Sequence, residues 1–186
     1  MKSFVSFAAM LFLIAGCGAP SERYAVSSPD ATQTHRIAFR AVEIRDVSLP
    51  SYAADDQIVL GATDGRLVNA GDVLWADTPE RAISLSLSRH ISQITGARVA
   101  SNPWPFEALP DARLDLRFQT LLAGEDGQYH AKGLYFVAVG DGRRERSGLF
   151  DLTVAFDPVG GPAAIAQARG QVVLDLAAFL SRSALR

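Results

Sequence analysis

The sequence has 186 residues, of which 48% are hydrophobic and 20% charged, which fits one globular domain and excludes a disordered chain. Its net charge of −2 lacks the basic excess of nucleic-acid-binding proteins. A single cysteine and three scattered histidines exclude a disulfide framework and leave little material for a metal site, so we expect no metal, no cofactor and no nucleic-acid partner.

The N-terminus has the pattern of a secretory signal peptide. Lys2 precedes an eleven-residue apolar run, Phe4 to Ile14, which is much shorter than the ~20 residues a spanning helix needs. The run ends in Leu13-Ile14-Ala15-Gly16-Cys17, which resembles a bacterial lipobox. By that resemblance the signal peptide, residues 1–16, is removed and Cys17 is acylated. The alternative is an ordinary signal peptide that ends near an incidental cysteine.

A lipid anchor and a tether are expected to follow. Two or three acyl chains hold a protein durably in a membrane without a spanning helix. Gly18 stands where inner-membrane lipoproteins often carry Asp, so the resemblance to sorted lipoproteins implies the periplasmic face of the outer membrane. Residues 17–35 are rich in small and polar residues without apolar periodicity, which predicts a lipidated N-terminus and a flexible tether. The folded domain is then expected over residues 36–186.

The first part of this domain is expected to form strands. A strand is expected over 36–47, with a phase change of its apolar residues at Arg40 and Ala41 that indicates a bulge. Pro50 ends this strand because proline cannot donate to a ladder, and shorter strands follow over 57–61 and 67–75.

A helix is expected next. Thr78-Pro79-Glu80 combines a capping residue, a first-turn proline and an acid at the positive end of the helix dipole. Gly96 marks its end. His90 lies beside the apolar stripe and is interpreted as a flank residue, not a ligand. The stripe consists of Ile83, Leu87, Ile91 and Ile94.

The second half of the domain is predicted to form strands and a final helix. After a short strand over 97–100, strands are expected over 113–122, 129–139 and 149–156. In the first of these, one buried face is expected to consist of Leu114, Leu116, Phe118 and Leu122.

The final helix is expected over 163–185, with an apolar face of Ile165, Val172, Leu176 and Phe179. Gly170 inside it costs about 1 kcal/mol relative to alanine, which indicates a kink or close packing. The element order predicts an α+β fold: a single domain with a mostly antiparallel sheet and two amphipathic helices packed on one face.

No set of residues in the sequence has a pattern typical of a catalytic site. The sequence contains neither a GxSxG motif nor a phosphate-binding loop, and no two histidines have ligand spacing. Asp55-Asp56 is interpreted as a solvated pair. We therefore expect no catalytic residues. The alternative is a small hydrolase built from scattered residues, which a pocket joining Ser, His and a carboxylate would support.

Four stretches, in this order, resemble the ABC-type transport auxiliary lipoproteins, the PqiC family. They are the lipobox at Cys17; Leu49-Pro50-Ser51-Tyr52 with Gln57-Ile58-Val59; Trp75-Ala76-Asp77; and Ala100 to Trp104 with the later Arg117-Phe118. Two stretches depart from the family pattern: Asp77-Thr78-Pro79-Glu80 replaces an acidic-Pro-Leu continuation, and Ile37-Ala38-Phe39 replaces Tyr-x-Leu.

The resemblance implies a non-enzymatic component anchored in the outer membrane. It implies docking to an MCE-domain protein that works with a permease and an ATPase to move lipids or other hydrophobic compounds between the membranes. A homo-oligomer is conceivable. The alternative is a regulator of an envelope synthetic enzyme. Candidate partner-binding residues are Pro50, Tyr52, Trp75 and Trp104, because binding residues concentrate in loops and aromatic residues are frequent anchors; the alternative is that both tryptophans cover the edge of the core.

Overall fold

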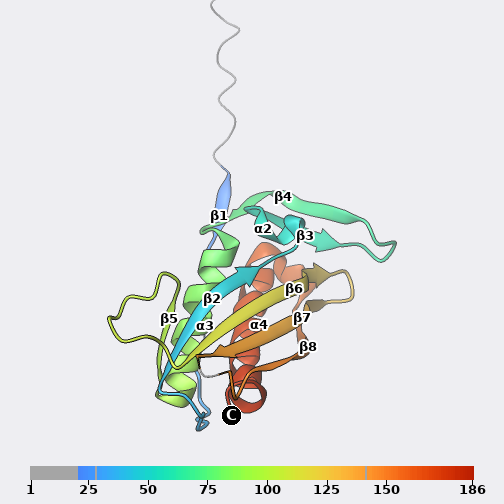
Figure 1. Ribbon diagram of the computed structural model, residues 1–186. Coiled ribbons are helices and arrows are strands. Elements are labelled where there is room, and N and C mark those ends of the chain that lie inside the picture. The colour runs from blue at the N-terminus through green and yellow to red at the C-terminus, as the bar shows by residue number, and fades with distance from the viewer. Residues whose placement is uncertain (1–20, 28, 141) are drawn as a thin grey trace, which may run out of the picture.

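The computed structural model describes residues 21–27, 29–140 and 142–186, which form one sheet backed by two long helices (Figure 1). The strands are β1 (Glu22–Tyr24), β2 (Ala41–Ser48), β3 (Gln57–Gly61), β4 (Leu67–Trp75), β5 (Arg98–Ser101), β6 (Ala112–Gly124), β7 (Gln128–Val139) and β8 (Arg146–Ala155). The helices are α2 (Ser51–Ala54), α3 (Pro79–Thr95) and α4 (Gly161–Ser183), with a short 3-10 helix, η2 (Pro158–Gly160), before the last. The expected signal peptide and Cys17 lie outside the described residues.

The sheet is built around β6, its longest strand. One edge of β6 pairs with β2 in parallel, and the other pairs with β7 in an antiparallel ladder that β8 continues. β5 extends the sheet beyond β2, while the far end of β6 pairs with β3, which is followed by β4 and β1. The antiparallel ladders are the longest, and the parallel pairs arise because α3 and the β3–β4 hairpin lie between β2 and its parallel partners in the chain. The expected single α+β domain is confirmed.

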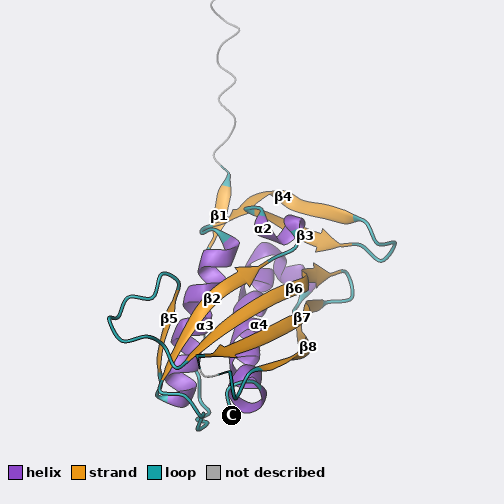
Figure 2. Cartoon of the chain, viewed as in Figure 1, coloured by secondary structure: helices purple, strands orange, loops and turns teal. Residues whose placement is uncertain are grey.

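Both long helices cover one face of the sheet, as Figure 2 shows. All four residues of the stripe expected on α3 are buried, and α3 ends at Gly96 in the left-handed conformation. Thr78 makes no side-chain cap; instead the Asp77 carboxylate accepts a hydrogen bond from the Thr78 amide at 2.9 Å. On α4, Phe179 is only half-buried and packs edge-on against Tyr135, with ring centroids 6.1 Å apart. The other residues expected on the apolar face of α4, Ile165, Val172 and Leu176, are buried.

The segment Pro158–Ser183 is long and apolar enough to span a membrane by length and composition alone. However, 56% of its apolar window is buried inside the domain. Apart from its charged Arg169, its buried side consists of small and aliphatic residues that pack on α3, β7 and β8. This helix is therefore the core helix of the domain.

Two β-bulges change which residues face the core. The pairing of β6 with β7 shifts between Phe118 and Thr120, so Leu121 is buried while Leu122, expected on the core face, is only half-buried. A bulge adds one residue to a strand and so reverses the alternation after it. In β2 a shift of this kind lies after Ile44, and the strand begins at residue 41 instead of 36.

A flexible tether was expected over 17–35, but its described residues, 21–27 and 29–35, are packed against the domain. β1 pairs in parallel with β4, and the residues after it lie against the helices. Asp30 forms an ion pair with Arg89 of α3 at 2.6 Å, and the His35 amide donates to the carbonyl of Ile94 at 2.8 Å. We call residues 25–27 and 29–35 the strap. Because the strap and β1 make these contacts, the folded domain begins at β1 and not at residue 36.

The strap explains the glycine in α4. A Cβ on Gly170 would overlap the carbonyl oxygen of Ser27 and lie 2.8 Å from its carbonyl carbon. Only glycine lets the strap backbone approach the helix this closely. Of the two possibilities that the sequence offered for Gly170, close packing is therefore the one found.

Candidate partner-binding surface

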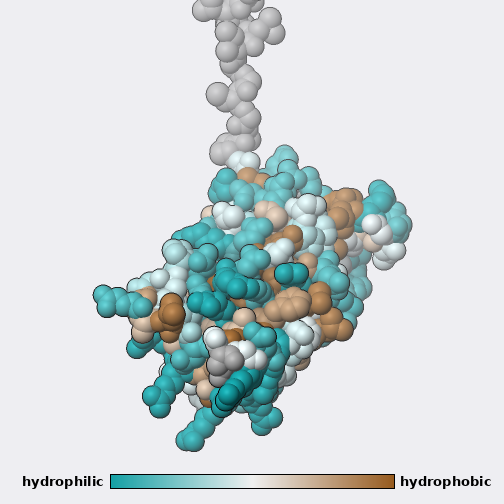
Figure 3. Space-filling view, viewed as in Figure 1, coloured by the Kyte–Doolittle hydropathy of each residue, from teal (hydrophilic) through white to brown (hydrophobic). Residues whose placement is uncertain are grey.

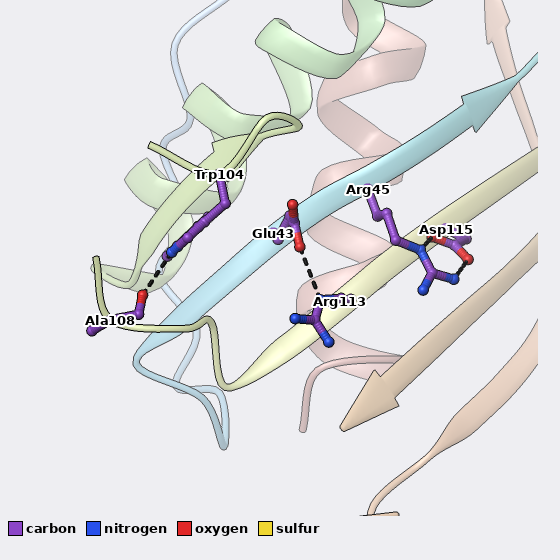
Figure 4. A network of polar contacts seen from close by, with 6 residues as sticks. All are labelled: Glu43, Arg45, Trp104, Ala108, Arg113 and Asp115. Carbon is purple, nitrogen blue, oxygen red and sulfur yellow. Dashed lines mark hydrogen bonds and ion pairs between the residues drawn. The ribbon is translucent and has the colours of Figure 1, made fainter. Parts of the chain in front are cut away.

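The sheet face that the helices leave uncovered carries two interstrand ion pairs (Figure 4). Arg45 on β2 donates from Nε to Oδ1 of Asp115 on β6 at 2.8 Å, and its Nη2 contacts the other carboxylate oxygen. Nearby, Arg113 Nε donates to Oε2 of Glu43 at 3.0 Å. Both carboxylates are nearly buried, whereas the guanidinium groups are partly exposed. The acids are thus covered, and what reaches the solvent is mainly arginine.

The hydrogen bond and the charge of Asp115 raise the pKa of Arg45 above its usual value. These pairs are charge-assisted and fix the two arginine side chains across the strands. The side chains therefore form a polar surface on which each of the two arginines is paired with a carboxylate of the neighbouring strand.

An apolar strip adjoins these pairs on the same face. The Arg117 guanidinium lies over the Phe136 ring, 4.9 Å from its centroid. Leu134 is paired with Arg117 on one side and with Leu149 on the other, and the Leu149 side chain is 71% exposed. In Figure 3 this face is a mixture of hydrophilic and hydrophobic side chains. Arginines next to exposed aliphatic and aromatic groups are typical of protein interfaces.

The loop over residues 102–111, between β5 and β6, projects from the edge of the sheet (Figure 1). Trp104 is half-buried, and its indole N–H donates to the carbonyl of Ala108 at 2.7 Å. Its ring meets Phe106 edge-on, with centroids 5.0 Å apart, and the Arg98 guanidinium lies over Phe106. Leu109 is 76% exposed. The loop thus presents ordered aromatic and apolar groups to the solvent, as a binding anchor would.

The other three candidates lie elsewhere. Trp75 is 5% exposed at the end of β4 and belongs to the core. Tyr52 is half-buried, and its hydroxyl oxygen accepts a hydrogen bond from the Leu121 amide at 3.3 Å. The Pro50 carbonyl accepts from the amides of the first turn of α2. Tyr52 and Trp75 line the same small interior pocket, far along the sheet from the Trp104 loop.

The burial of Trp75 agrees with the alternative interpretation, that this tryptophan covers the edge of the core. Of the four candidates, Trp104 is the one that lies in the loop projecting from the sheet. Sequence reasoning missed the Arg45–Asp115 and Arg113–Glu43 pairs. The opposite charges on alternating positions of two strands were visible, but their pairing depended on a parallel register that only the structure gives.

Within the described part of the chain, no group of three His, Cys, Asp or Glu side chains lies close enough to hold a metal ion. Two pockets of about 400 Å³ have carboxylates and no histidine in their lining: Asp175 beside the strap, and Asp46 with Glu80 between β2 and α3.

A family model described as ABC-type transport auxiliary lipoprotein component matches residues 24–181. The chain belongs to this family. The expected family is thereby confirmed, and the match covers three of the four stretches but not the lipobox at Cys17. The match begins within β1, so it includes the strap. The protein is an auxiliary lipoprotein component of ABC-type transport, which implies a place in the cell envelope and association with a transporter.

Solved structures share the fold of this auxiliary lipoprotein. One, titled an uncharacterized protein, is 19% identical with a TM-score of 0.66, covering 88% of this chain and 99% of its own. Another, a DUF330-family protein from Xanthomonas campestris, is 15% identical with a TM-score of 0.64, covering 87% and 95%. At these identities the likeness shows the fold alone. No curated protein sequence matches the chain.

Proposed function

We propose that this auxiliary lipoprotein is anchored through acyl groups on Cys17 to the periplasmic face of the outer membrane, where it docks an MCE-domain protein. That partner, with a permease and an ATPase, moves lipids or other hydrophobic compounds across the envelope. The observation that carries the proposal is the family match over residues 24–181, which spans nearly all of the described domain. The role is non-enzymatic, and ATP hydrolysis belongs to the partners.

The docking surface in this proposal is the Trp104 loop together with the uncovered face of the sheet. Trp104 is held by its hydrogen bond to Ala108, so little side-chain entropy is lost when a partner covers it. Arg45, Arg113 and Arg117 supply a positive rim that steers and orients a partner carrying acidic groups. Aromatic residues and arginine are the side chains that most often dominate binding energy.

Two substitutions test the proposal in cells. Cys17→Ala should release the protein from membranes or leave its signal uncleaved. Trp104→Ala should leave the melting temperature unchanged and weaken co-purification with the MCE-domain protein. Val159→Ala is the matched control, because Val159 is 92% exposed on η2, away from the loop. The anchor is contradicted if Cys17→Ala still fractionates with the outer membrane, and the docking surface is contradicted if both loop and control variants co-purify equally well.

A further inference from the structure

A buried arginine lies at the β1 end of the domain. Arg169 on α4 is 2% exposed, and its guanidinium lies 4.3 Å from the centroid of the Trp75 ring. Its Nη2 donates to the carbonyl of Pro79 at 3.4 Å. Among the described residues, no carboxylate forms an ion pair with it, and burial lowers its pKa.

A guanidinium has five N–H donors, and burying it without a counter-ion is costly. In the described part of the chain one long hydrogen bond and an aromatic face are its direct polar contacts, while Glu80 interacts with it electrostatically without forming an ion pair. The arrangement therefore has donor capacity that the protein itself leaves without a directly bound anion.

Arg169 lines a pocket of about 270 Å³ that opens beside β1. The lining is largely apolar and includes Tyr24 and Val26 at and after the end of β1, Trp75 at the end of β4, and Leu85 on α3. The acid at the pocket, Asp77, is already ion-paired with Arg81. Ser86 adds a hydroxyl. The pocket therefore combines a buried cation, Arg169, with apolar walls, and its one acid, Asp77, is already paired. These features suit a ligand that carries an anionic group on an apolar molecule.

The pocket also lies close to the expected anchor. β1 begins five residues after Cys17, and five extended residues span at most about 18 Å. Residues 24–26, which are the last residue of β1 and the two after it, line the pocket. In Figure 1, β1 and the start of α3 lie at one end of the domain, and the C-terminus lies at the other. An acylated Cys17 thus keeps the pocket near the membrane surface.

We propose that this pocket binds the phosphate of an anionic phospholipid headgroup in the anchoring membrane, with Arg169 as the anion-binding residue. The proposal rests on the proposed function, because it uses the Cys17 anchor to bring the pocket to the bilayer. Binding there fixes the β1 end of the domain against the membrane and so orients the Trp104 loop relative to it.

The test uses the unacylated chain from residue 18, which contains every described residue, and vesicles of phosphatidylcholine with or without phosphatidylglycerol. Arg169→Met should weaken binding to the phosphatidylglycerol vesicles at least about thirtyfold, as expected for loss of a desolvated charge pair. Arg66→Gln, which removes an exposed charge on the β3–β4 hairpin, should cost no more than about fivefold.

Arg169→Met is expected to fold, since replacing a buried charge by an apolar residue of similar length is often neutral or stabilising. Ser86→Phe provides a second variant that fills the pocket and leaves Arg169 in place; it should lose binding to the same extent. Equal binding by wild type, Arg169→Met and Ser86→Phe overturns the site.

Inorganic phosphate is the competing source of the same chemistry. Competition by phosphate as strong as that by short-chain phosphatidylglycerol would overturn the lipid assignment. The anchor is tested separately by fractionation of Cys17→Ala. If Cys17→Ala remains in the membrane while vesicle binding still depends on Arg169, the proposed anchor fails and the pocket stands. If Cys17→Ala is released while the vesicle results do not depend on Arg169, the pocket fails and the anchor stands.

Discussion

Replacing Gly170 with alanine is expected to destabilise this protein, although the same change in an ordinary helix interior stabilises by about 1 kcal/mol. Gly170 is buried where the strap crosses α4. The new Cβ would meet the carbonyl group of Ser27, which is backbone and yields only if the strap shifts. Shifting the strap exposes Val26 and Ala31, which pack against the core.

The expected size of the effect follows from two opposing contributions. Overpacking of this kind costs about 1–3 kcal/mol, and the gain in helix propensity is about 1 kcal/mol. The exposed Asp30–Arg89 ion pair that holds the strap adds at most about 1 kcal/mol to the cost of displacing it. Together these values give a net loss of about 0–3 kcal/mol in the free energy of unfolding, and we expect the middle of this range, about 1–2 kcal/mol.

Urea unfolding of the chain from residue 18 measures this free energy, and hydrogen exchange of the amides in the strap shows whether the strap has loosened. Gly140→Ala is the control, because a Cβ there meets no atom within 4 Å; its effect should stay within about 0.5 kcal/mol. If Gly170→Ala instead stabilises the protein by about 1 kcal/mol and leaves hydrogen exchange in the strap unchanged, the close packing of the strap on α4 is refuted.

Three further outcomes are expected. Trp75→Ala should lower the free energy of unfolding by about 3–5 kcal/mol in urea, and a loss below about 1 kcal/mol would show that Trp75 is not a core residue. Asp115→Asn should lower the free energy of unfolding by about 1–2 kcal/mol, a value between those of exposed and buried ion pairs. A double-mutant cycle with Arg45→Met should show coupling between the two residues, and additive effects would contradict the pair. Burial lowers the pKa of His90 from its ordinary 6.5, so the unfolded state binds the proton more readily and stability should fall as the pH drops from 6.5 toward the lower folded value. Urea titrations at several pH values in this window should show a smaller slope for His90→Gln, and an unchanged slope would contradict this reasoning.

The helices and most strands could be predicted because their signals are local. Ile83, Leu87, Ile91 and Ile94 repeat at helical spacing, and Gly96 ends the helix in the conformation that only glycine adopts easily. Residues after the β6 bulge were assigned to the opposite face because one inserted residue reverses the alternation, and nothing near Gln119 marks the insertion in the sequence.

The strap could not be predicted because few of its residues are apolar. It is held by backbone contacts, one ion pair and the shape of Gly170, and none of these has a local sequence pattern. For the proposed docking surface, Trp104 was expected in a loop and lies in one. Trp75 looked equivalent in sequence, but its position at the end of β4 places it under the Arg169 guanidinium.

Site-specific photocrosslinking in cells tests most directly whether this auxiliary lipoprotein docks a transporter. A photoreactive residue would replace Phe106 in the exposed loop or, as the control, Asp64 in the β3–β4 turn at another end of the sheet. We expect the probe at 106 to crosslink an MCE-domain protein identified by mass spectrometry, and the probe at 64 to give little of this product. Equal crosslinking from both positions, or no transporter component from position 106, would contradict the account.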